Sequence, residues 1–144
     1  MKNKYFWGGN PRNDLLFSDK NCKEMLGINN QYDKIILFMP TFRKSKIINR
    51  IDSTSDFPII SSKNISEINS FLKENKVLLV IKPHPYQNDI EFLNLEFTNI
   101  IKFTNEDLAM KNVLLYELLG QVDALVTDYS SVYFDFLLTQ KPID

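Results

Sequence analysis

Short apolar runs, rich in β-branched residues and ended by proline or polar residues, constrain the fold of this chain most. They cover residues 34–40, 76–83, 99–103 and 123–128. Their length and composition predict buried strands rather than helices. Because helical patterns lie among them, we expect parallel strands in a sheet with helices on both faces. The predicted fold class is therefore α/β, with a Rossmann-like parallel sheet.

Helical spacing of apolar residues occurs in segments 18–27, 64–75, 111–120 and 130–140. Asn64 and Glu67 have the spacing of a capping box at the start of the second segment. Gly27 and Gly120 are expected to end helices. The polar stretch 43–62 is interpreted as a long loop over the sheet, and "KPID" at 141–144 as the start of another strand.

Composition removes several classes of function. The 144 residues, 44% hydrophobic and 24% charged, fit one globular domain. A net charge of −1 gives no general attraction to nucleic acid, so no nucleic-acid partner is expected. The single cysteine, Cys22, excludes an internal disulfide. No signal peptide and no apolar run of about 18 residues is found, which predicts a cytoplasmic protein.

The positions of the four glycines exclude two common nucleotide-binding motifs. With glycine only at positions 8, 9, 27 and 120, neither a G-x-G-x-x-G fingerprint nor a P-loop can be written in this chain. A standard dinucleotide dehydrogenase or P-loop NTPase is therefore not expected. No cofactor is predicted, and no metal-binding residues are predicted.

Polar residues cluster where the expected strands end. In an open parallel sheet, ligands bind at the carboxyl ends of the strands. The first cluster follows the short apolar stretch 5–7, and the others follow the strands at 34–40, 76–83 and 123–128. Together they contain Arg12, Asn13, Asp14, Thr41, Arg43, Lys82, His84, Asp128, Ser130 and Ser131. These clusters predict an anion-binding pocket at one edge of the sheet.

The residue types leave several roles open. His84, held between Pro83 and Pro85, could be a general base, a donor to a phosphate oxygen or an ordinary surface residue. Ser130 and Ser131 could cap the following helix or bind phosphate, because both roles use the same turn. Asp128 could orient a loop, bind a ribose hydroxyl or transfer a proton.

The charged residues carry similar alternatives. Arg43 and Lys82 could be solvated charges or could offset the charge of an anion. Asp14 and Asp135 are interpreted as structural, with Asp14 capping the helix after "PRN" and Asp135 on a polar helix face.

Four successive motifs resemble those of the CDP-glycerol glycerophosphotransferases of teichoic acid and capsule synthesis. They are "GNPRND", "ILFMPTFRKS", "LLVIKPHP" and "LLYELLGQVDALVTDYSSVYFDFLLTQKPI", and the resemblance spans residues 9–143. It implies a GT-B architecture of two Rossmann-like lobes, of which this chain is similar to the C-terminal, donor-binding lobe. It also implies transfer of glycerol phosphate from CDP-glycerol to a hydroxyl of a growing polymer, with release of CMP.

The resemblance also assigns roles to residues. It places His84, the expected catalytic residue, beside the donor diphosphate. Ser130 and Ser131 would contact phosphate, and Arg43 and Lys82 would offset its charge. The expected substrate-binding residues are Arg12, Thr41, Arg43, Lys82, Asp128, Ser130 and Ser131.

Several expectations concern the whole protein. Residues 1–144 are expected to form one donor-binding lobe that lacks the acceptor lobe and its own C-terminal end, and that is inactive alone. The full-length protein is expected to meet a polymer acceptor through the missing lobe and to associate peripherally with the inner face of the cell membrane. The donor could instead carry another CDP-linked polyol. Two alternatives remain, a GT-B glycosyltransferase or epimerase that uses a nucleotide sugar, and a nonenzymatic interaction module.

Overall fold

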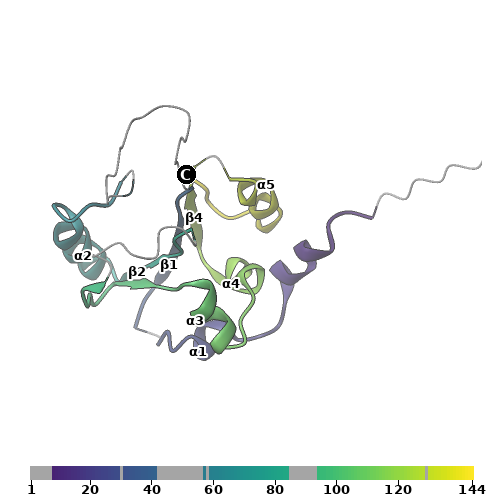
Figure 1. Ribbon diagram of the computed structural model, residues 1–144, viewed down its shortest axis with the longest axis horizontal. Helices are drawn as coiled ribbons and strands as arrows, with labels where there is room; N and C mark the ends of the chain where they lie inside the picture. Colours follow the sequence, from purple (N-terminus) through teal and green to yellow (C-terminus); the bar gives the residue numbers. More distant parts are fainter. Residues whose placement is uncertain (1–7, 30, 42–56, 58, 85–93, 129) are drawn as a thin grey trace, which may run out of the picture.

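The computed structural model describes residues 8–29, 31–41, 57, 59–84, 94–128 and 130–144. Within these residues, four parallel strands form one sheet in the order β3-β2-β1-β4 (Figure 1). The strands are β1 (Lys34–Met39), β2 (Val77–Ile81), β3 (Ile100–Lys102) and β4 (Ala124–Thr127). Each lies inside one of the apolar runs identified in the sequence, so the predicted strands and the α/β fold class are confirmed.

Strand register aligns the buried residues in rows across the sheet. Leu37 of β1 lies beside Val80 of β2 and beside Leu125 of β4. All three side chains are fully buried. Side chains alternate between the faces of a strand, so this row defines one face, and Phe38 with Ile81 defines the other.

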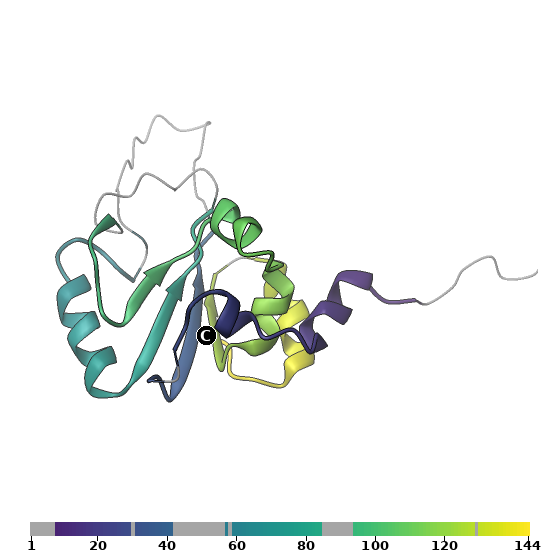
Figure 2. The ribbon, with the colours of Figure 1, turned by 90° about the horizontal axis from the view of Figure 1, so that it is seen from below.

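Helices cover both faces, as expected. The face of Leu37 packs against one group of helices, and the face of Phe38 packs against α2 (Ile65–Glu74). Figure 2 shows α2 on the side of the sheet opposite to α4 and α5. The first group consists of η1 (Pro11–Phe17), α1 (Cys22–Met25), α3 (Asn105–Met110), α4 (Leu115–Gln121) and α5 (Val132–Phe136), which η4 (Leu137–Thr139) continues.

The predicted capping box of α2 is wrong. The Asn64 side chain makes no capping bond to the helix. Its Oδ1 accepts from the Ser61 N–H at 2.8 Å, and its Nδ2 donates to the Ile59 carbonyl at 3.0 Å. Asn64 therefore stabilises the turn before the helix, a competing use of the same amide.

Gly120 does not end a helix, contrary to expectation, but lies inside α4. A Cβ atom at this position would come within 2.0 Å of the Leu16 carbonyl oxygen. Gly120 is therefore needed for the close approach of η1 to α4. Gly27, by contrast, follows α1 with a φ of +74°, as a glycine that ends a helix commonly does.

The segment 142–144 runs beside β4, as the sequence predicted for the start of another strand. Ile143 forms a parallel bridge with Leu125. The Leu125 N–H donates to the Pro142 carbonyl at 3.1 Å, and the Thr127 N–H donates to the Asp144 carbonyl at 2.9 Å. The apolar stretch 5–7 and most of the expected loop 43–62 lie outside the described residues.

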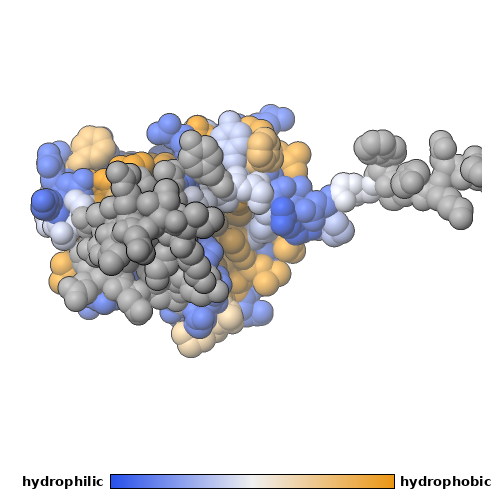
Figure 3. Space-filling model, turned by 45° about the horizontal axis from the view of Figure 1, so that its top comes forward, coloured by the Kyte–Doolittle hydropathy of each residue, from blue (hydrophilic) through white to orange (hydrophobic). Residues whose placement is uncertain are grey.

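Hydrophobic side chains also reach the surface on α5 and η4 (Figure 3). Phe134 is 71% exposed, and Leu137 and Leu138 are about half exposed. No helix in the described ranges combines the length and the apolar character needed to cross a membrane.

Candidate functional site

The carboxyl ends of β1, β2 and β4 lie at one edge of the sheet, because the strands are parallel and adjacent (Figure 2). Thr41 follows β1, Lys82 and His84 follow β2, and Asp128 follows β4 together with the serines that precede α5. Most of the predicted site residues that the structure describes thus lie at the same edge of the sheet. Arg43 lies outside the described residues.

Two hydrogen bonds join the ends of β1 and β4. The Asp128 carboxylate accepts from the Thr41 N–H, with 2.7 Å between Oδ1 and the nitrogen. The Thr127 hydroxyl donates to the Met39 carbonyl, also at 2.7 Å. The bond to Thr41 corresponds to one of the roles that the sequence left open for Asp128, the orientation of a loop. A direct contact with substrate stays a prediction.

The serine turn that begins α5 is partly accessible. Ser130 is half-buried, and its hydroxyl accepts from the Val132 N–H at a long 3.4 Å. Ser131 is exposed, and its side chain makes no capping bond. The capping alternative thus applies weakly to Ser130 and does not apply to Ser131. Both hydroxyls lie in a turn that is not sealed inside apolar packing.

Lys82 is buried at the end of β2, with 5% of its surface exposed. Its ammonium donates to the Pro83 carbonyl at 3.3 Å. Burial lowers the pKa of Lys82, although the nearby carboxylates of Glu106 and Asp107 oppose this shift. His84, two residues later, is exposed. The predicted roles of both residues remain untested.

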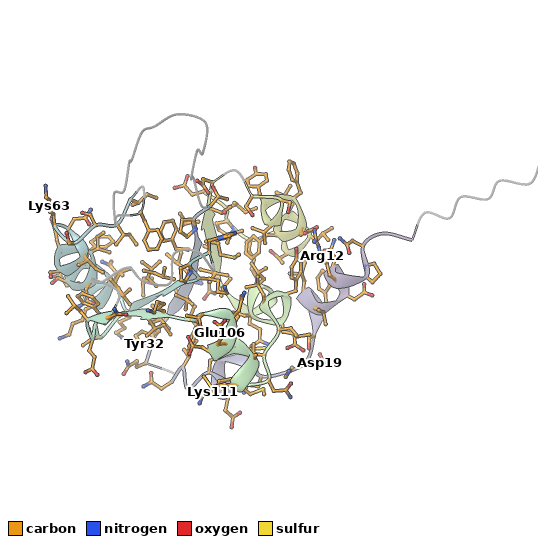
Figure 4. All side chains as sticks on the ribbon, in the orientation of Figure 1. Arg12, Asp19, Tyr32, Lys63, Glu106 and Lys111 are labelled. Atoms are coloured by element: carbon orange, nitrogen blue, oxygen red, sulfur yellow. The ribbon has the colours of Figure 1, made fainter. Side chains whose placement is uncertain are left out.

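Arg12 makes a structural contact that the sequence did not predict. Its Nη2 lies 2.8 Å from Oδ2 of Asp135, and the Tyr116 hydroxyl donates to the same oxygen at 2.5 Å. The guanidinium carbon also stacks 5.2 Å from the centre of the Tyr116 ring. These contacts join η1, on which Figure 4 labels Arg12, to α4 and α5. A contact between Arg12 and substrate stays a prediction.

Ionisation of this cluster follows from its contacts. Burial raises the pKa of Tyr116 to about 12, and the hydrogen bond to Asp135 adds to the shift. Burial alone would raise the pKa of Asp135, but the contacts with Tyr116, Asn13 and Arg12 hold it below its usual range. Asp135 is therefore an ionised structural carboxylate, in agreement with its interpretation.

Asp14 does not cap the helix after "PRN", contrary to expectation. Asn10 occupies the N-cap position of η1, and its Oδ1 accepts from the Arg12 N–H at 3.3 Å. Asp14 lies in the first turn of the same helix. Asparagine is as favourable as aspartate at this position, so residue type alone did not separate the two.

A cavity of about 580 Å³ lies elsewhere, beside β3. It is lined by residues from the segment between α1 and β1, from β3 and from the segment before β3, among them Tyr32, Phe97 and Ile101. None of the predicted site residues lines this cavity. The candidate site is therefore the edge at the strand ends.

Taken together, the fold and the strand ends define a Rossmann-like α/β protein whose predicted site residues gather at one edge of the sheet. Residues 1–143 match the family model described as CDP-Glycerol:Poly(glycerophosphate) glycerophosphotransferase. The chain belongs to this family, as its motifs indicated.

Named relatives agree with this assignment. The chain is 34% identical over 137 residues to the teichoic acid glycerol-phosphate primase of Bacillus subtilis, covering 94% of this chain and 31% of the relative. It is 28% identical over 151 residues to the teichoic acid glycerol-phosphate transferase of Staphylococcus aureus, covering 98% of this chain and 34% of the relative. The chain thus spans about a third of the length of these relatives.

A solved structure shares the fold. The wall teichoic acid polymerase TagF superposes with a TM-score of 0.59 at 22% sequence identity, over 94% of this chain and 32% of that structure. The likeness supports the parallel α/β arrangement found here.

Proposed function

We propose that this chain supplies the donor site of an enzyme that transfers glycerol phosphate from CDP-glycerol to a hydroxyl of a cell-surface polymer. The family description names both the donor and the polymer. The structural observation that carries the proposal is the convergence of three strand ends, two of which are joined by the bond between Asp128 and Thr41. A CDP-linked polyol other than CDP-glycerol would fit the same site.

In the proposed reaction, a hydroxyl oxygen of the acceptor attacks the phosphorus that carries the glycerol. A new P–O bond forms, the P–O bond to CMP breaks, and the acceptor proton passes to a base. Ser130, Ser131 and Lys82 would donate to the diphosphate oxygens and stabilise the charge on the departing CMP. His84 would lie beside the diphosphate, as a donor to it or as the base.

The remaining parts of the reaction belong to the proposal as well. The polymer acceptor would bind through a second lobe, because this chain spans only about a third of its relatives. The full-length enzyme would work on the cytoplasmic side of the cell membrane and contact it peripherally. Residues 1–144 would form one donor-binding lobe and would not catalyse transfer alone.

Calorimetry with CDP-glycerol and CMP tests the donor site. The chain is expected to bind both, and the double variant Ser130→Ala, Ser131→Ala is expected to bind them about tenfold more weakly, which corresponds to one lost hydrogen bond to a charged group. Ser70→Ala is the control, because the Ser70 hydroxyl bonds to the Ser66 carbonyl on the exposed side of α2.

Two results would contradict the proposal. The first is a folded chain that binds neither nucleotide. The second is a UDP-sugar that displaces CMP more effectively than CDP-glycerol does, which would favour the nucleotide-sugar alternative.

A further inference from the structure

The cavity beside β3 has the size of a small-molecule site and is separate from the candidate site. Its volume of about 580 Å³ falls within the range of roughly 300–1,000 Å³ that is typical of ligand pockets. An engineered cavity of about 150 Å³ is enough for benzene, so this one has room for a body of roughly two or three rings. None of the predicted site residues lines it, so the donor site does not account for it.

The cavity runs around the free side of β3, which is the last strand on its side of the described sheet. Ile101 belongs to the face that packs on α4, whereas Ile100 belongs to the opposite face, yet both line the cavity. Consecutive residues of a strand point to opposite faces, so the cavity extends past the side of the strand. Leu95, which also lines it, is 61% exposed, so the cavity opens to solvent.

Two hydrogen bonds hold the walls of the cavity. The hydroxyl of Tyr32, which Figure 4 labels, donates to the Thr98 carbonyl at 2.7 Å and joins the segment after α1 to the segment before β3. The Lys102 ammonium donates to Oδ1 of Asn94 at 3.0 Å and holds that second segment against β3. The fold itself therefore shapes the cavity, as it does in the largely preformed pockets that bind small molecules.

The inner surface suits a flat apolar body. Leu26 and Leu78 line it from the core and are 7% and 1% exposed. The aromatic side chains of Tyr32, Phe97 and Phe103, all half-buried, line it nearer the surface. Aromatic rings stack on other rings in addition to burying area, so this lining favours an aromatic ligand.

The charged residues of the lining favour a negative group on that ligand. Lys102 is half-buried, and in the described part of the chain its ammonium has one hydrogen bond, to Asn94, and no carboxylate at ion-pair distance. The Asp107 carboxylate lies near enough to act on Lys102, but it accepts from the Thr104 N–H and hydroxyl. These two bonds hold the pKa of Asp107 below its usual value, and Lys102 adds a smaller contribution. Glu96, on the same lining, is exposed, so water screens its repulsion of an anion.

We propose that the cavity beside β3 binds an aromatic anion, a flat apolar ring system that carries one negatively charged group. The ring system would lie against Tyr32, Phe97 and Ile101, and the charged group would accept from the Lys102 ammonium. Bonds between an ammonium and an anionic acceptor are among the stronger hydrogen bonds in proteins. This second site goes beyond the proposed function and shares no residue with the donor site.

Fluorescence titration of the full chain with two probes of nearly the same shape tests the proposal. Anilinonaphthalene sulfonate carries a negative charge, and neutral phenyl-naphthylamine is the same ring system without it. Both are expected to bind, and Lys102→Met should weaken the sulfonate about tenfold while leaving the neutral probe within about twofold. Lys23→Met is the matched control, because Lys23 is a half-buried lysine of α1 that does not line the cavity. It should leave both affinities unchanged.

Three further variants locate the probes. Ile101→Phe should weaken both probes by at least about tenfold, because its ring would fill part of the cavity. Leu95→Asp serves if that variant fails to fold, since Leu95 is exposed and a carboxylate there should weaken the sulfonate more than the neutral probe. Phe134→Ser removes an exposed apolar side chain of α5 and should leave both affinities unchanged.

Several results would overturn the proposal. A folded chain that binds neither probe would exclude the site. Equal effects of Lys102→Met on the two probes would exclude the role of the charge. Binding that is lost in Phe134→Ser and kept in Ile101→Phe would place the probes on α5. Displacement of the sulfonate by CDP-glycerol would place the probe at the strand ends instead.

Discussion

Replacing Asp128 tests whether the joined strand ends shape the candidate site. In Asp128→Ala the Thr41 N–H loses a charged acceptor 2.7 Å away. A hydrogen bond to a charged group contributes about 1.5–3 kcal/mol, and the partial exposure of both residues favours the lower end of this range. We therefore expect the free energy of unfolding in urea to fall by about 1.5 kcal/mol. Affinity for CDP-glycerol should fall about tenfold as the end of β1 loses its attachment.

Asp128→Asn is the diagnostic variant. An asparagine side chain keeps an oxygen that can accept from the Thr41 N–H, so affinity should stay within about threefold of the original chain. The Thr41 amide signal in NMR reports the bond directly, and its slow hydrogen exchange should persist in the asparagine variant and be lost in the alanine variant.

Thr127→Val provides the matched control at the same pair of strands. It removes the donor to the Met39 carbonyl and should cost about 1 kcal/mol of stability while leaving affinity unchanged. The reasoning fails if Asp128→Asn binds CDP-glycerol as weakly as Asp128→Ala while the Thr41 amide stays protected. That result would show that the carboxylate contacts the ligand itself.

Two further predictions concern stability. Gly120→Ala should lower the free energy of unfolding in urea by more than about 3 kcal/mol, because the added Cβ would meet the Leu16 carbonyl oxygen. This loss outweighs the gain of about 1 kcal/mol that alanine brings over glycine in an open helix. A stabilised variant would refute the close packing of η1 on α4. Burial would raise the pKa of Glu117, but bonds from the Leu114 N–H and from Lys20 hold it below 4.5. The stability that this carboxylate contributes is therefore present above pH 4.5 and is lost as the pH falls through its lower folded-state pKa. Glu117→Gln should therefore reduce the fall in the thermal midpoint that the original chain shows on acidification below pH 4.5. An unchanged pH profile would contradict this.

Local patterns were enough to predict the sheet but not the contacts across it. A run such as 34–40 is apolar on both faces because both faces are covered, so its own residues indicate a central strand. The residues at the strand ends followed from the same reasoning, because parallel strands end at one edge. Their bonds did not follow, since Thr41 and Asp128 are 87 residues apart and either could have bonded locally.

The wrong assignments have the same origin. Asn64 and Glu67 had the correct spacing for a capping box, yet the Asn64 amide found partners in the preceding turn. Gly120 was predicted to end a helix because glycine is unfavourable inside helices. The close contact with Leu16 that requires glycine there comes from a segment about a hundred residues earlier. Such long-range contacts override local preference and leave no periodic signal in the sequence.

The pairing of residues 142–144 with β4 also affects how the molecule meets copies of itself. A strand with free N–H and C=O groups along its side can recruit a strand from another molecule and begin aggregation. Here the outward N–H groups of Leu125 and Thr127 are already bonded to carbonyls of Pro142 and Asp144. Addition of a strand from another molecule to this side of β4 would first require residues 142–144 to separate from it, so this segment blocks β4 itself from intermolecular pairing.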